Sequence, residues 1–168
     1  MDSNWNSTNH LEMRRPNPMK IVKDKTTSLH QQILGTWEIL AWKRRLVESG
    51  EESDAFGPAP TGCINYSPDG RLMVLVLRGD RPCPSENPPT ESEKVALFDS
   101  MFAYAGSYAV ESDRVIHNLD ASWNELWTGT LQTRFISFEN EQLIYTTPET
   151  VDPMDGKLCT YKVTLGRP

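Results

Sequence analysis

Along most of the chain after residue 33, large apolar and polar residues alternate with the period of a β-strand. In the first such run, Trp37, Ile39 and Ala41 fall on one face of an extended chain. Turn residues separate the runs, and Asp69-Gly70 is the clearest hairpin signal. The pattern predicts eight strands, at residues 34–42, 62–67, 71–78, 108–111, 115–120, 128–138, 142–146 and 158–165.

One segment has helical rather than strand spacing. Thr90 followed by Glu93 forms a capping box, the usual start of a helix. Gly106 is typical of a helix end. Between them lies an apolar stripe made of Val95, Phe98, Met101, Phe102 and Ala105. We expect this helix to cap one open end of the folded domain.

Sequential short strands joined by tight turns predict an antiparallel meander, and closure into a barrel removes its exposed edges. The predicted fold class is therefore all-β: a closed, antiparallel, up-and-down β-barrel of about eight strands with one capping α-helix. Such a barrel holds side chains and one small ligand. We assign residues 27–168 to it, opened by a short helical turn that Ser28 caps. Residues 1–26 are polar and are expected to form a flexible tail.

Composition narrows the function classes. The 168 residues carry a net charge of −6, which argues against a nucleic-acid partner. Cys63, Cys83 and Cys159 are an odd set without metal-ligand spacing, which favours a reducing compartment. No apolar run suits a signal peptide or a membrane span, so we expect a cytoplasmic protein without a membrane partner. Phosphate-loop, metal-binding and serine-hydrolase motifs are absent from the sequence, so we expect no cofactor and no metal.

A short opening motif and four later, separated motifs carry a family resemblance. Leu34-Gly35-Thr36-Trp37 looks like the Gly-x-Trp start of lipocalins. The later motifs follow in order: Gly62-x-Ile64-x-Tyr66-Ser67-Pro68-Asp69-Gly70-Arg71-Leu72, Tyr104-Ala105-Gly106-Ser107-Tyr108, Val115-Ile116-His117 and Trp127-x-Gly129-x-x-Gln132-x-Arg134. Over about residues 30–165 the chain resembles the small lipocalin-like domain family of bacteria and fungi. Relatives by fold include cyclases and isomerases that act on polyketide- or terpene-derived intermediates, which is an analogy of fold only.

His117 is the first candidate for chemistry. It shares a strand face with Val115 and Leu119, which favours an interior position, and we expect it to be the only histidine of the folded part. A neutral imidazole with a pKa near its ordinary value of about 6.5 can accept or donate a proton. The alternative is a structural histidine, bonded to a tyrosine or to the backbone.

Gln132 and Arg134 share one face of the strand at residues 128–138 with Thr130. This face points either into the barrel or into solvent, and the sequence leaves both registers open. An arginine that points inward needs an acid or a polar ligand as its partner.

Aromatic residues complete the candidate site. Tyr66, Tyr104 and Tyr108 are candidate hydroxyl donors, and we expect Tyr104 and Tyr108 to look into one mouth of the barrel. Three further aromatic residues are candidates for ligand contact, namely Phe102, Trp123 and Trp127. Ordinary core packing is the alternative for each of these side chains.

These residues support two main hypotheses. The first is a cofactor-free isomerase or cyclase that holds a small hydrophobic polyketide- or terpene-derived intermediate. In it His117 moves a proton, and Arg134, with Tyr104 or Tyr108, stabilises an oxyanion. The alternative is a non-catalytic protein that binds or carries a small hydrophobic metabolite. A third reading is an accessory subunit, in which the strand at residues 72–77, apolar on both faces, forms a homodimer.

Overall fold

The computed structural model describes residues 28–152 and 155–168, so the tail predicted for residues 1–26 lies outside the described part of the chain. The elements in chain order are α1 (Leu29–Ile33), β1 (Gly35–Leu46), β2 (Glu52–Asp54), β3 (Thr61–Tyr66), β4 (Arg71–Leu77), α2 (Glu91–Asp99), β5 (Met101–Glu111), β6 (Arg114–Ser122), the short 3-10 helix η1 (Glu125–Trp127), β7 (Leu131–Glu139), β8 (Gln142–Thr146), β9 (Thr150–Val151) and β10 (Leu158–Gly166).

The strands form a closed antiparallel barrel, as predicted. Their order is β1-β3-β4-β5-β6-β7-β8-β10, and β10 pairs again with β1. The short strands β2 and β9 pair at the side, onto β1 and β10. The eight barrel strands correspond one by one to the eight expected from the alternating pattern, although β5 begins at Met101 rather than near residue 108.

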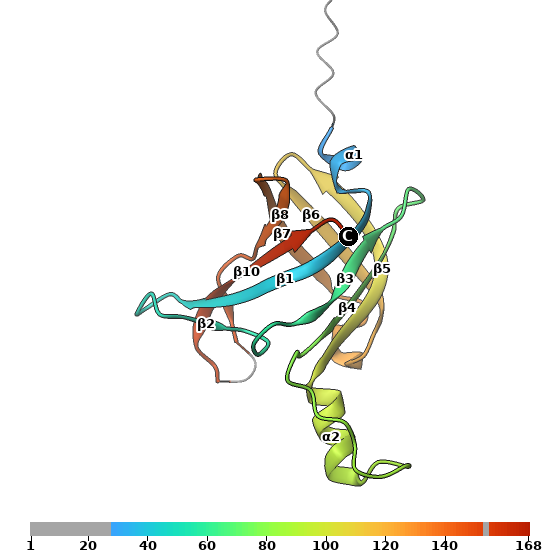
Figure 1. Ribbon diagram of the computed structural model, residues 1–168. Helices are drawn as coiled ribbons and strands as arrows, with labels where there is room; N and C mark the ends of the chain where they lie inside the picture. The colour runs from blue at the N-terminus through green and yellow to red at the C-terminus, as the bar shows by residue number, and fades with distance from the viewer. Residues whose placement is uncertain (1–27, 153–154) are drawn as a thin grey trace, which may run out of the picture.

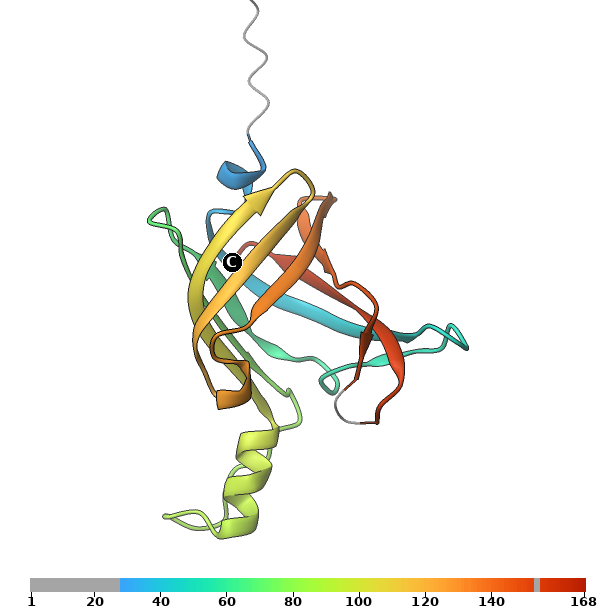
Figure 2. The ribbon, with the colours of Figure 1, turned by 180° about the vertical axis from the view of Figure 1, so that it is seen from behind.

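The two ends of the barrel differ (Figures 1 and 2). At the end next to α1, tight hairpins join β3 to β4, β5 to β6 and β7 to β8. At the opposite end, next to α2, longer connections carry β2, α2, η1 and β9. We call these the α1 end and the α2 end. Functional side chains often lie on loops that a rigid scaffold positions. The longer connections therefore make the α2 end the first place to look for a functional site.

The predicted capping helix is wrong in its length and in its place. The capping box of Thr90 and Glu93 forms, but α2 ends at Asp99 and buries none of its residues. It projects away from the barrel instead of covering an end (Figure 1). Phe102 belongs to β5, where its side chain points inward and is buried. A short apolar run fits both periods, so spacing alone did not separate helix from strand.

Gly106 is also not a helix end. It lies in β5 directly after a break in the β5–β6 register, between Ala105 and Gly106. A Cβ atom at Gly106 would lie 2.0 Å from the carbonyl oxygen of Asn118 on β6. The glycine therefore permits a close approach of two backbones.

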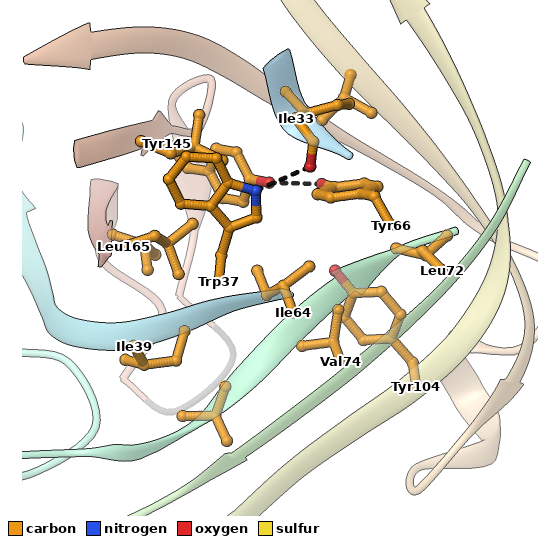
Figure 3. Close-up of a cluster of buried hydrophobic side chains, with 14 of the residues drawn as sticks. Ile33, Trp37, Ile39, Ile64, Tyr66, Leu72, Val74, Tyr104, Tyr145 and Leu165 are labelled. Atoms are coloured by element: carbon orange, nitrogen blue, oxygen red, sulfur yellow. Dashed lines mark hydrogen bonds between the residues drawn. The ribbon is translucent and has the colours of Figure 1, made fainter. Parts of the chain in front are cut away.

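The α1 end is closed by a packed core (Figure 3). Ile33 of α1 is fully buried, and its carbonyl accepts a hydrogen bond of 2.8 Å from the indole Nε1 of Trp37. The guanidinium of Arg167 stacks 3.8 Å from the centre of the Trp37 ring. It also donates hydrogen bonds to the carbonyls of Gln32, Leu34 and Thr36. Helix, tryptophan and arginine together seal this end.

The strand expected to be apolar on both faces is β4. Leu72, Val74 and Val76 are buried inside the barrel, whereas Met73 and Leu75 point outward and are 63% and 40% exposed. Among residues 28–152 and 155–168, no element covers this outer face.

We predict that Arg167→Ala lowers the free energy of unfolding by about 1–2 kcal/mol, because the cation–π contact and the bonds to three carbonyls are lost. Urea denaturation measures the change. Arg45→Ala is the matched control, because the Arg45 side chain is exposed and forms no hydrogen bond or ion pair with a described residue. Equal stability of the two variants would contradict the closure assigned to Arg167.

Candidate functional site

A histidine surrounded by tyrosines lies in the middle of the barrel. His117 of β6 is completely buried, and its Nε2 and Nδ1 atoms lie 2.6 Å and 2.7 Å from the hydroxyls of Tyr66 and Tyr104. Tyr145 of β8 donates a 2.6 Å hydrogen bond to the Tyr66 hydroxyl. Figure 3 shows these two tyrosines meeting beside Trp37. We call Tyr145, Tyr66, His117 and Tyr104 the phenol–imidazole chain.

The phenol–imidazole chain is uncharged. Burial, with the positive charge of Arg134 as a second cause, lowers the pKa of His117 well below 6.5. Burial raises the pKa of Tyr66 and of Tyr104 above the ordinary value of 10.0. Since Tyr145 donates to Tyr66, the Tyr66 hydrogen is left for Nε2. A neutral imidazole then carries its own hydrogen on Nδ1 and donates it to Tyr104.

The register of β7 answers the question that the sequence left open. Gln132 pairs with His117 and Arg134 pairs with Val115, and paired residues share a face. Because His117 and Val115 are both fully buried, Gln132 and Arg134 point into the barrel. Both remain half-buried, so solvent still reaches them.

Arg134 is an inward cation without a counter-charge. Its Nη1 donates 3.0 Å to the carbonyl of Thr133. Its charge also lowers the pKa of Tyr104 against the larger effect of burial. In the described part of the chain, Arg134 forms no ion pair with a carboxylate. Gln132 donates its amide to the hydroxyl of Thr130 at 3.2 Å.

Aromatic side chains gather at the α2 end. We call them the mouth cluster: Trp42, Phe56, Phe102, Trp123, Trp127 and Tyr161. Phe102 is central, with ring centres 4.8 Å from Trp123, 5.1 Å from Trp127 and 5.3 Å from Trp42. All except Phe102 are half-buried. The sequence had singled out Phe102, Trp123 and Trp127, and the structure brings these three together.

Trp42 and Phe56 were missed. The alternation through Trp37 and Ile39 predicts Ala41, not Trp42, on the inner face. A bulge between Ile39 and Ala41 shifts the register, so Trp42 pairs with the inward Val163 instead. The spacing of the large side chains, which jumps from two to three residues after Ile39, was the available signal.

Tyr108 does not share a mouth with Tyr104, so that expectation is wrong. Its hydroxyl donates 2.9 Å to the carbonyl of Ser67, in the β3–β4 turn at the α1 end. Its ring stacks on His30 of α1, with centres 5.9 Å apart. His117 is therefore not the only histidine of the described fold.

A second polar group, also missed, ties the α2 end together. Arg44 of β1 pairs with Asp152 and Asp155, at 2.8 Å and 2.7 Å. The Tyr161 hydroxyl donates 2.9 Å to Asp152. The bond from Arg44 lowers the pKa of Asp155. These contacts fasten the β8–β10 connection to β1 beside the mouth cluster.

Three further observations concern the rest of the described chain. A groove of about 640 Å³ lies at the α1 end, lined by residues that include Leu40, Phe138, Gln142 and Arg167. The Arg167 guanidinium is already bonded to three carbonyls there, so its donors are not free for a ligand. Within residues 28–152 and 155–168, no three His, Cys, Asp or Glu side chains are grouped to hold a metal ion. No helix in that part of the chain has the length and apolar character to span a bilayer.

We predict that His117 makes stability fall in mild acid. The unfolded chain takes up a proton at the ordinary pKa of 6.5, whereas the folded imidazole resists it. The free energy of unfolding therefore falls as pH drops below about 6.5, by at most about 1.4 kcal/mol per pH unit from this group. Urea denaturation of the protein and of His117→Gln between about pH 7 and about pH 5 isolates the contribution.

His30→Gln is the control, since His30 is exposed on α1. We expect the free energy of unfolding of this variant to fall with pH as steeply as that of the unmodified protein. In His117→Gln the slope is smaller by the contribution of the buried imidazole. The assignment fails if both variants keep the slope of the unmodified protein.

Comparison with known proteins adds one strong match. A family model described as a lipocalin-like domain matches residues 34–163, which span the barrel from the start of β1 into β10. A search of curated proteins finds no match. Among solved structures, an uncharacterized protein from Bacteroides eggerthii is 10% identical, with a TM-score of 0.39, over 80% of this chain and 99% of that chain.

Proposed function

The chain belongs to the lipocalin-like domain family, and on that premise we propose that its barrel binds a small, largely apolar molecule bearing an anionic or hydrogen-bond-accepting oxygen. The observation that carries this proposal is Arg134, which points inward, is half-buried and has no carboxylate partner among the described residues. A guanidinium that loses part of its hydration inside a barrel is stabilised by an acceptor. A ligand oxygen supplies that acceptor.

The apolar part of the ligand is proposed to lie against the mouth cluster. Small-molecule sites are lined mainly by apolar and aromatic side chains, with few polar groups that fix orientation. The aromatic rings of Trp42, Phe102 and Trp127 meet the first requirement, and Arg134 and Gln132 meet the second. Entry is proposed at the α2 end, because Ile33, Trp37 and Arg167 seal the α1 end.

We predict that the protein binds phenylnaphthylamine and, more tightly, anilinonaphthalene sulfonate, which is the same ring system with an added sulfonate. Arg134→Gln lowers the affinity for the sulfonate probe by about tenfold or more, because a charge-assisted hydrogen bond is lost. The same substitution changes the affinity for phenylnaphthylamine by less than about twofold. Fluorescence titration measures both affinities.

Arg45→Gln is the matched control, because it removes an exposed charge of the same kind. Absence of binding by either probe to the unmodified protein contradicts the proposed function. An equal loss for both probes in Arg134→Gln contradicts the role of the guanidinium.

The phenol–imidazole chain supports a second, catalytic candidate: a cofactor-free isomerase or cyclase acting on a polyketide- or terpene-derived intermediate. With Nδ1–H of His117 donating to Tyr104, the Tyr104 hydroxyl hydrogen is left to donate beside Arg134. A phenol and a guanidinium together can stabilise a developing enolate oxygen. Binding is the better supported function, since His117 is completely buried and meets a substrate only through its tyrosines.

Chromatography distinguishes the two candidates. A ligand that co-purifies with the protein is incubated with fresh protein and with Tyr104→Phe. Because an isomer has the same mass as its parent, a change in retention time is the readout. Turnover by the protein, reduced at least about tenfold in Tyr104→Phe, supports the enzyme. An unchanged ligand after prolonged incubation supports binding alone.

Two further expectations remain proposals. A cytoplasmic location is supported by the free thiols of Cys63, Cys83 and Cys159. A homodimer through the outer face of β4 is supported by the exposure of Met73 and Leu75. Light scattering at low and high concentration tests the dimer.

A further inference from the structure

The indole N–H of Trp42 is a buried donor with no acceptor. Its Nε1 atom is shielded from solvent and has no hydrogen-bond partner among the described residues. Buried polar atoms are almost always paired, so an unpaired one calls for an explanation. Trp42 lies in the mouth cluster, packed edge-on against Phe102 and Tyr161. The unpaired donor is therefore part of the wall of the proposed ligand site.

Phe56 covers the face of this indole. The two rings are stacked, with centres 5.4 Å apart and planes 29° apart. Phe56 comes from the connection between β2 and β3 and not from the barrel wall. A flat ligand ring could take the position of Phe56 on this face. Because the Nε1–H bond lies in the plane of the indole, the acceptor for it has to be on a substituent that reaches past the edge of the ring.

The backbone next to Phe56 is anchored independently of the Phe56 side chain. The preceding residue, Ala55, donates its N–H to the carbonyl of Trp42 at 2.9 Å, which anchors the backbone. Phe56 itself is only half-buried. Rotation of its side chain toward solvent breaks no hydrogen bond, because a phenyl group makes none.

We propose that Phe56 is a resident plug of the ligand site, and that a flat, conjugated ligand displaces it and accepts a hydrogen bond from Trp42 Nε1 through a carbonyl-type oxygen. This inference rests on the proposed binding function and names its ligand class. Arg134 then binds one oxygen of the ligand, and Trp42 donates a hydrogen bond to another. A fully apolar ring gains only the stacking, so Trp42 selects between ligands by the presence of an acceptor.

Two naphthalene probes and two variants test the proposal. Prodan carries a ketone on a dimethylaminonaphthalene ring, and dimethylaminonaphthalene itself lacks the ketone. Trp42→Phe keeps an aromatic ring and removes the N–H. We expect this variant to bind prodan with about fivefold lower affinity and to change the affinity for the ketone-free probe by less than about twofold.

Phe56→Ala is the independent second variant, and it decides the question of the plug even if Trp42→Phe does not fold. We expect this variant to bind both probes with about fivefold higher affinity, because no side chain has to be displaced. Phe138→Ala is its matched control, since Phe138 is a partly exposed phenylalanine outside the mouth cluster. This control changes neither affinity.

Failure of the inference is distinct from failure of the proposed function. If neither probe binds the unmodified protein, the binding function is wrong and the inference falls with it. If both probes bind but lose affinity equally in Trp42→Phe, the indole only packs against the ligand and donates no hydrogen bond to it. If Phe56→Ala leaves both affinities unchanged or weakens them, Phe56 is not a plug.

Discussion

A completely buried imidazole must find a partner for each of its two nitrogens, and in this barrel both partners are tyrosine hydroxyls. The hydroxyls come from Tyr66 on β3 and Tyr104 on β5, and Tyr145 on β8 extends the chain. Four strands are thereby joined across the interior, and among them only β5 and β6 also pair directly through the backbone. Loss of one partner would leave a buried polar atom unpaired, which costs about 1–3 kcal/mol. The same burial keeps the imidazole neutral and removes it from direct contact with a ligand.

The phenol–imidazole chain gives the interior two unlike halves. Toward α1, the side chains of Ile33, Trp37 and Leu165 are packed without exposure or nearly so, and Arg167 seals the end. Toward α2, the rings of the mouth cluster remain half-buried and longer connections surround them. Arg134 is also half-buried, but it pairs with Val115 near the β5–β6 hairpin, so along β6 and β7 it lies on the α1 side of His117. Its charge acts on the phenol of Tyr104. The fully packed side chains are therefore concentrated toward α1, and the proposed ligand site opens toward α2.

The sequence predicted the elements better than it predicted their faces. Alternation and turn residues are local signals, and they sufficed for the eight barrel strands and for the Asp69-Gly70 hairpin. Whether Arg134 points inward depends on the pairing of β6 with β7, which no local pattern encodes. The bulge at Leu40 reverses the faces of β1, so that Trp42 lies inside and Ala41 does not. Phe102 was assigned to a helix because its spacing to Phe98 also fits a helical face.

The most direct measurement is a crystal structure of the protein with anilinonaphthalene sulfonate bound. The account predicts a sulfonate oxygen within hydrogen-bond distance of the Arg134 guanidinium and the naphthalene ring against Trp42, with Phe56 turned away. His117 should keep both tyrosine partners. A probe seated on the outer face of β4 or in the groove at the α1 end, with the mouth cluster unchanged, would contradict the account.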